Sequence, residues 1–77
     1  MNRTEIMRLR KYLNDKFDTD KFELAAGNQK DGSMELHFAG EFLGVIYRDE
    51  DEGELSYALN IAILEEDLPV ASDTSLI

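Results

Sequence analysis

The residues with the clearest chemical potential are five carboxylates within six positions, between an apolar run and the start of a second strand. They are Asp49, Glu50, Asp51, Glu52 and Glu54. Several carboxylate oxygens at one turn are the kind of ligands that Ca²⁺ and Mg²⁺ prefer. The sequence therefore offers one candidate metal site, made of Asp49, Asp51, Glu52 and Glu54.

The spacing of this acidic turn does not fit an EF-hand loop. With Asp49 as the first position, Gly53 falls one place before the glycine that such a loop requires, and Asn60 stands where the bidentate glutamate belongs. Acidic runs more commonly form solvated turns. A divalent-cation-binding protein is thus the alternative function hypothesis, and a solvated turn is the simpler interpretation.

Elsewhere the chain shows no catalytic pattern. His37 is the only histidine, there are no cysteines, and the five glycines are too dispersed to form a phosphate-binding loop. His37 is expected to be a surface residue paired with Glu35 or Arg48. No nucleophile or acid–base pair can be assembled, so the sequence predicts neither an enzyme nor a bound cofactor.

Composition excludes several classes of partner. The net charge of −9 and the isoelectric point near 4.3 disfavour binding to nucleic acid or to anionic membranes. The charge is segregated, because residues 1–21 carry a net charge of +2 and residues 22–77 carry −11. The absence of cysteine suits a reducing compartment, and a cytoplasmic location is expected.

A helix is predicted over residues 3–16. Asn2 and Glu5 have the spacing of a capping box at its start. Apolar residues then recur at three- and four-residue steps and form one narrow stripe: Ile6, Leu9, Leu13 and Phe17.

Beyond residue 21 the apolar period changes to two, which is typical of strands. Four strands are expected, at about 22–26, 34–38, 42–48 and 55–63, with a glycine-bounded loop over 27–32. The predicted fold is α+β, with the N-terminal helix packed on one face of a four-stranded antiparallel β-meander. Residues 1–68 form a single domain in this prediction, and 69–77 form a flexible C-terminal tail.

The turns fix the expected register. A two-residue turn at 40–41 and a three-residue loop at 51–53, each with a glycine suited to positive φ, define the pairing of the last three strands. The opposed pairs would be Phe38 with Leu43, Leu36 with Val45, Tyr47 with Tyr57, and Val45 with Leu59. Arg48 is expected to form an ion pair with Glu54 across the hairpin neck.

This register leaves an apolar second face that no predicted element covers. Its candidate interface residues are Phe42, Ile46, Ala58, Asn60, Ala62 and Leu64. The alternatives are simple exposure or coverage by Val70, Leu76 or Ile77 from the tail. The leading hypothesis is a non-enzymatic module that binds a protein partner or itself, with a homodimer as one form.

Residues 41–46, 48–54 and 55–57, together with the opening helix and residues 62–64, resemble a known family. This is a small alphaproteobacterial family catalogued as domain of unknown function 3126. The resemblance covers roughly residues 5–68 and leaves the tail outside. It implies no activity, because the family has no assigned function.

Overall fold

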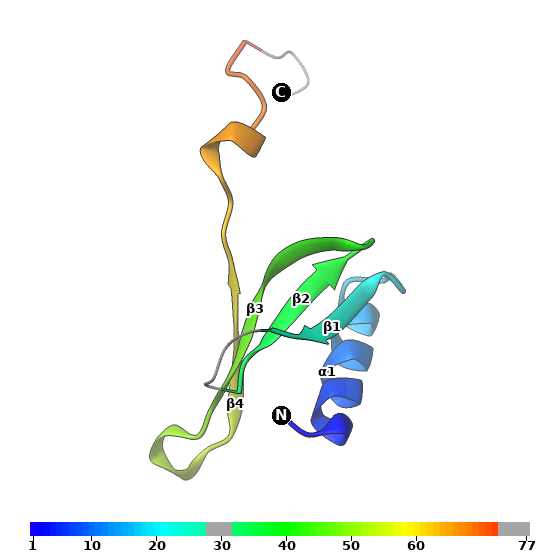
Figure 1. Ribbon diagram of the computed structural model, residues 1–77, viewed down its shortest axis with the longest axis vertical. Helices are drawn as coiled ribbons and strands as arrows, with labels where there is room; N and C mark the ends of the chain where they lie inside the picture. The colour runs from blue at the N-terminus through cyan, green and yellow to red at the C-terminus, as the bar shows by residue number, and fades with distance from the viewer. Residues whose placement is uncertain (28–31, 73–77) are drawn as a thin grey trace.

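The computed structural model describes residues 1–27 and 32–72 (Figure 1). Its elements, in chain order, are α1 (Arg3–Lys16), β1 (Phe22–Ala26), β2 (Met34–Phe38), β3 (Glu41–Asp49), η1 (Asp51–Gly53), β4 (Ser56–Ile61) and η2 (Glu65–Asp67), where η denotes a single 3₁₀ turn. The predicted loop over 27–32 and the predicted tail both lie partly outside the described residues. Among the described residues no helix is long and apolar enough to span a membrane.

The capping box predicted at the start of α1 is confirmed. The Asn2 side chain accepts a hydrogen bond from the Glu5 amide at 2.8 Å, and the Glu5 carboxylate accepts one from the Asn2 amide at 3.2 Å. Two of the amides that have no partner within the helix are therefore satisfied. The helix ends at Lys16, as predicted, and Phe17 is its C-cap.

The four strands form one antiparallel sheet in the order β1-β2-β3-β4, and α1 lies on one face of it (Figure 1). This arrangement confirms the predicted α+β class. The core between helix and sheet is small and consists of Leu13 from α1, Phe22 from β1, Leu36 from β2 and Ile46 from β3. Leu36 at the centre of the sheet is fully buried.

The predicted register between β2 and β3 is wrong by two residues at the turn and by one residue beyond it. The turn consists of Ala39 and Gly40, both with positive φ, so that Phe38 pairs with Glu41. Further along, Leu36 pairs with Gly44 and not with Val45. A β-bulge lies between these two pairs, because Leu43 is an extra residue on β3.

The register between β3 and β4 is also shifted by one. Arg48, and not Tyr47, lies opposite Tyr57, and Ile46 lies opposite Leu59. The loop that joins the strands runs from Glu50 to Leu55, longer than the predicted three residues. The two one-residue errors add up to a shift of two residues between β2 and β4. Because the side-chain period of a strand is two, β4 still presents the predicted side chains to the helix, while most of β3 is turned over.

This reversal changes which side chains of β3 are buried. Ile46 faces the helix and is only 2% exposed, and Gly44 lies on the same side. Val45 and Tyr47 point to the rear face, which is the sheet face opposite the helix. The predicted placement of Ile46 on the rear face is therefore wrong, as is the predicted Tyr47–Tyr57 pair in the core.

Strand β4 ends at Ile61, two residues earlier than predicted. Beyond it, residues 62–72 project from the sheet as a C-terminal arm that contains η2 (Figure 1). The molecule measures 47 × 25 × 24 Å and its radius of gyration is 15.0 Å. A compact domain of this length has a radius of gyration of about 11 Å, and the arm accounts for the difference in shape.

Replacing Gly44 should destabilise the sheet. A Cβ at this position would overlap the backbone carbonyl of Asn60 on β4, so a Gly44→Ala protein must push the two strands apart. We expect a loss of about 1–3 kcal/mol in the free energy of unfolding, measured by urea denaturation. Ala58→Gly on the paired strand is the control and should cost at most about 1 kcal/mol. An equal or smaller loss for Gly44→Ala would contradict this account of the close approach.

Candidate functional site

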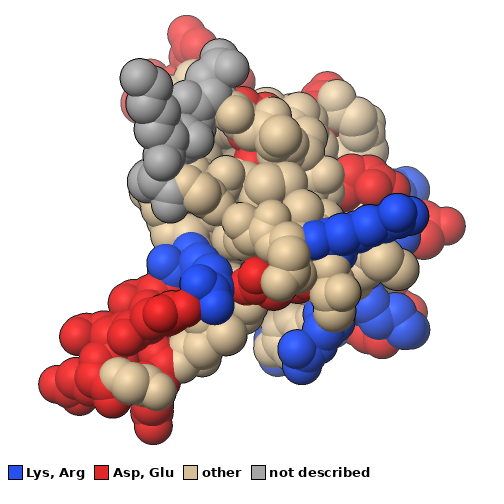
Figure 2. Space-filling model, turned by 60° about the horizontal axis from the view of Figure 1, so that its bottom comes forward, with Lys and Arg blue, Asp and Glu red and all other residues tan. Residues whose placement is uncertain are grey.

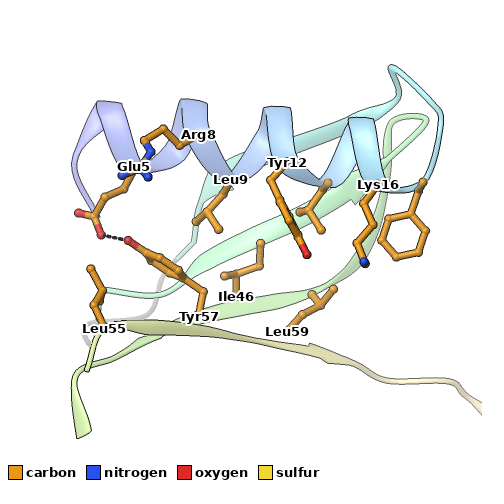
Figure 3. Close-up of a pocket in the computed structure, with 11 residues that line it drawn as sticks. Glu5, Arg8, Leu9, Tyr12, Lys16, Ile46, Leu55, Tyr57 and Leu59 are labelled. Atoms are coloured by element: carbon orange, nitrogen blue, oxygen red, sulfur yellow. Dashed lines mark hydrogen bonds between the residues drawn. The ribbon is translucent and has the colours of Figure 1, made fainter. Parts of the chain in front are cut away.

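An apolar concavity lies between α1 and the β3–β4 half of the sheet, on the helix-facing side (Figure 3). We call it the α1–β4 groove, and its volume is about 650 Å³. The helix contributes Glu5, Arg8, Leu9, Tyr12, Leu13 and Lys16, followed by Phe17, and the sheet side contributes Ile46, Leu55, Tyr57 and Leu59. Most of this lining is apolar, with charged groups along the helix rim.

The groove exists because α1 is fixed to β1 along most of its length. The Asn14 side chain makes two hydrogen bonds to the Phe22 backbone, at 2.9 and 3.3 Å, in the manner of a neighbouring strand. The Arg10 guanidinium binds both Glu23 carboxylate oxygens at 3.0 Å. A single helix held over β1 does not cover the β4 side of a four-stranded sheet.

At one end, the groove is closed by contacts that join the first turn of α1 to β3 and β4. The Tyr57 hydroxyl donates to Glu5 Oε2 at 2.6 Å (Figure 3). The same oxygen accepts from Arg48 Nε at 2.8 Å, and the Glu5 side chain is 13% exposed. Because Glu5 Oε1 caps the helix, one carboxylate holds both the helix start and the sheet.

These contacts shift the pKa values of two groups in opposite directions. The hydrogen bond from Tyr57, assisted by the capping contact and by the charge of Arg48, lowers the pKa of Glu5 below its ordinary 4.5. The hydrogen bond to Glu5, together with desolvation, raises the pKa of Tyr57 above its ordinary 10.0. Both shifts keep Glu5 ionised and Tyr57 protonated at neutral pH.

The opposite end of the groove is open and apolar. Tyr12 of α1 and Phe17, which follows the helix, are 58% and 56% exposed. Leu59 of β4 lies across the gap from Tyr12 (Figure 3). Lys16 lies over the Tyr12 ring, with Nζ 5.8 Å from the ring centre. Such an exposed aromatic and aliphatic surface is typical of a contact site.

The acidic turn forms the exposed tip of the β3–β4 hairpin, and acidic side chains dominate this projecting end of the molecule (Figure 2). Asp49 accepts a hydrogen bond from the Asp51 amide at 3.0 Å. Arg48 binds Glu5 and Glu50, so the predicted ion pair with Glu54 is wrong.

The predicted metal ligands do not converge in this structure. Asp49, Asp51, Glu52 and Glu54 are all exposed. Within residues 1–27 and 32–72, no group of three or more His, Cys, Asp or Glu side chains is arranged to hold a metal ion. The turn has the geometry of a solvated hairpin loop, with Glu52 and Gly53 both at positive φ.

The predicted interface residues are distributed over three different places. Phe42, Ala58 and Asn60 lie on the rear face, with His37 against the Phe42 ring at 5.9 Å. Ile46 is in the core, whereas Ala62 and Leu64 belong to the C-terminal arm. His37 pairs with Glu35 at 3.0 Å, one of its two predicted partners.

Sequence reasoning did not find the α1–β4 groove. One signal was available, because the predicted stripe on α1 is too narrow to cover four strands. Tyr12, an aromatic residue beside that stripe, lies on the part of the helix surface that the sheet does not cover. Without the corrected register, Ile46 could not be assigned to the floor of the groove.

The fold and the groove define a small α+β protein with an open apolar groove between its single helix and an edge strand. The sequence profile of the DUF3126 family, described as a protein of unknown function, matches residues 5–67. The chain belongs to this family, and the predicted resemblance is confirmed over nearly the predicted range. A search of curated proteins and a search of solved structures each found no match.

Neutralising Glu5 should remove a pH-dependent part of the stability. Since the pKa of Glu5 is lower in the folded chain than its ordinary 4.5, its contribution is present above that value and is lost as the pH falls through the folded-state pKa. A Glu5→Gln protein should therefore be less stable than the wild type in urea at pH 7, and the gap should narrow at pH 3. Glu52→Gln, which removes one charge from the exposed hairpin tip, is the control. A gap of the same size at both pH values would refute the role of Glu5.

The hairpin tip should not bind calcium in a saturable way. With no convergent ligand set among the described residues, we expect no saturable change in the amide NMR shifts of residues 49–54 on addition of about 1 mM CaCl₂, a range in which weak protein calcium sites fill. Sodium chloride at matched ionic strength is the control. Saturable shifts confined to these residues would restore the metal-site hypothesis.

Proposed function

We propose that this protein is a non-enzymatic protein-interaction module that self-associates through the α1–β4 groove. The observation that supports this proposal most directly is the groove itself, with a volume of about 650 Å³ and exposed apolar walls. Tyr12, Phe17 and Leu59 are all large side chains that a monomer leaves in contact with water. Burying them against a partner would supply the hydrophobic free energy of association.

The size of the chain favours the same proposal. A domain of 77 residues without cysteines has only its packed core for stability. The buried core here is formed by Leu13, Phe22, Leu36 and Ile46. Association would extend this core through the open side of the groove.

The polar groups of the groove support binding over catalysis. Glu5 and Tyr57 are engaged with each other and with Arg48, in the protonation states that their pKa shifts maintain. The His37–Glu35 pair comes from β2 and faces the rear of the sheet. No observation on the described residues favours the alternative of divalent-cation binding.

Charge and composition indicate which partners and which location to expect. A net charge of −9 disfavours nucleic acid and anionic membranes as partners. The absence of cysteine fits a reducing compartment, so a cytoplasmic location is part of the proposal. The expected partner is a protein, and first of all a second copy of this chain.

A charge placed in the groove should weaken self-association. We expect Leu59→Glu on the sheet wall and Tyr12→Glu on the helix wall each to raise the dimer dissociation constant at least about tenfold, which corresponds to about 1.4 kcal/mol. Sedimentation velocity between about 1 and 300 μM would measure the change, since this range brackets micromolar affinity.

Met7→Glu is the matched control, because Met7 is 60% exposed on α1 and does not line the groove. Circular dichroism would verify that each variant is folded. A wild-type chain that stays monomeric over the whole range would overturn the proposed self-association. Equal effects of Met7→Glu and Leu59→Glu would remove the groove from it.

A further inference from the structure

Besides the groove, the C-terminal arm is a second feature that packs against nothing else among the described residues. Its exposed apolar residues are Ile63, Leu64, Leu68 and Val70. Ile63 is 73% exposed and Val70 is 67% exposed, whereas isoleucine and valine are among the residues most often buried. Figure 1 shows the arm leaving the sheet and making no return to it within the described residues.

We propose that the arm of a second copy adds to the free edge of β4 and closes the α1–β4 groove, with the two copies exchanging arms across a twofold axis. This inference rests on the proposed self-association and names the segment that performs it. An isologous contact of this kind closes on itself, so it stops at a dimer. The arm of each copy would then contact the β4 edge and the α1–β4 groove of the other copy.

The edge of β4 is chemically suited to pair with another strand. The strand has a neighbour on one side only, because the sheet order is β1-β2-β3-β4. Residues 55–64 contain no charged side chain in a chain of which 32% is charged. Soluble proteins usually protect an exposed edge with charges or proline. The other edge, β1, is partly occupied by the Asn14 side chain and carries Glu23.

The β-bulge in β3 lies at the point where the arm separates from the sheet. Pairing between β3 and β4 stops at Gly44 and Ile61, next to the extra residue Leu43. Beyond that point the chain continues in an extended conformation, and Leu64 still has φ −80° and ψ 140°. The arm therefore leaves the sheet without a neighbouring strand. Ile63 continues the alternation that puts Leu59 on the groove side.

Charge determines where the two strands overlap. An antiparallel pair centred on the middle of the uncharged segment 55–64 would put Glu54 of one copy beside Glu65 of the other, and these like charges repel. A pair centred near Ala62 avoids that contact. It also brings η2 of each copy alongside Leu59 of its partner, at the wall of the groove.

The groove rim there carries the opposite charge. Arg8 and Lys16 line the helix side of the groove, and neither forms an ion pair with another described residue. The η2 turn is Glu65-Glu66-Asp67, all exposed. The acidic turn of the arm thus complements the basic rim, while Ile63 and Leu68 supply apolar contacts.

A point change in the arm tests the contact without altering the described fold. Because Ile63 lies outside every strand and is largely exposed, Ile63→Glu should leave the circular dichroism spectrum and the unfolding midpoint of the monomer unchanged. It should raise the dimer dissociation constant at least about tenfold in sedimentation velocity. Met7→Glu, with the same charge change, should not.

A charge-exchange experiment tests the pairing of arm and rim. One full-length chain carries Arg8→Glu with Lys16→Glu, and another carries Glu65→Lys with Glu66→Lys. Each alone has like charges on arm and rim and should self-associate at least about tenfold more weakly than the wild type. Mixed together they should form a heterodimer with wild-type affinity, identified by native mass spectrometry. A mixture that associates no better than its components would overturn the arm exchange.

The outcomes separate this inference from the proposed function. If the wild type dimerises and Leu59→Glu weakens the dimer while Ile63→Glu does not, the groove is the interface and the arm proposal is wrong. If the wild type is monomeric and Ile63→Glu lowers its stability, the arm folds back onto its own chain, and both proposals are wrong. If Ile63→Glu and the charge-exchanged pair behave as expected, both are supported.

Discussion

The close contact between Gly44 of β3 and the Asn60 backbone of β4 is the constraint on which the rest of this structure depends. Only a residue without a Cβ allows the two strands to approach here. Directly before it, the bulge at Leu43 changes the register of β2 against β3. As a result Ile46 enters the core, and the pairing of β4 with β3 stops at Ile61 although β3 itself extends to Glu41. The groove floor and the projecting arm are both consequences of these two adjacent residues.

The position of the helix follows from contacts of a different kind. Asn14 and Arg10 fix the later turns of α1 over β1, whereas Glu5 fixes its first turn to Tyr57 and Arg48. The helix therefore bridges the sheet only at its N-terminal end. The remaining space beside β4 is the groove, so its shape is determined by polar contacts and its surface by apolar side chains.

The sequence predicted the elements of this fold well, because each leaves a local signal. The capping box of Asn2 and Glu5, the helical stripe and the alternating strands are readable from neighbouring residues alone. The predicted class and the order of the strands are confirmed. The face of β4 was also assigned correctly, although only because two one-residue errors of register add up to one full side-chain period.

What the sequence did not predict depends on register and on tertiary placement. A bulge adds one residue without changing the local pattern, so alternation alone assigned Ile46 to the wrong face. The partner of Arg48 could not be found from hairpin geometry, because Glu5 is distant in sequence. The groove was missed for the same reason, since it depends on where α1 sits over the sheet and not on the residues of any one element.

The acidic hairpin tip also affects how the uncharged segment that follows it can associate with other copies. Residues 55–64 share with segments that stack into fibrils the lack of charge, proline and glycine. In a fibril, identical residues stack about 4.8 Å apart, which is well inside the screening length of about 10 Å at 0.1 M salt. Residues 49–54 on one side and 65–67 on the other would then form continuous columns of like charge. A closed pair of strands avoids those columns, so the carboxylates that flank this segment make open-ended stacking unfavourable.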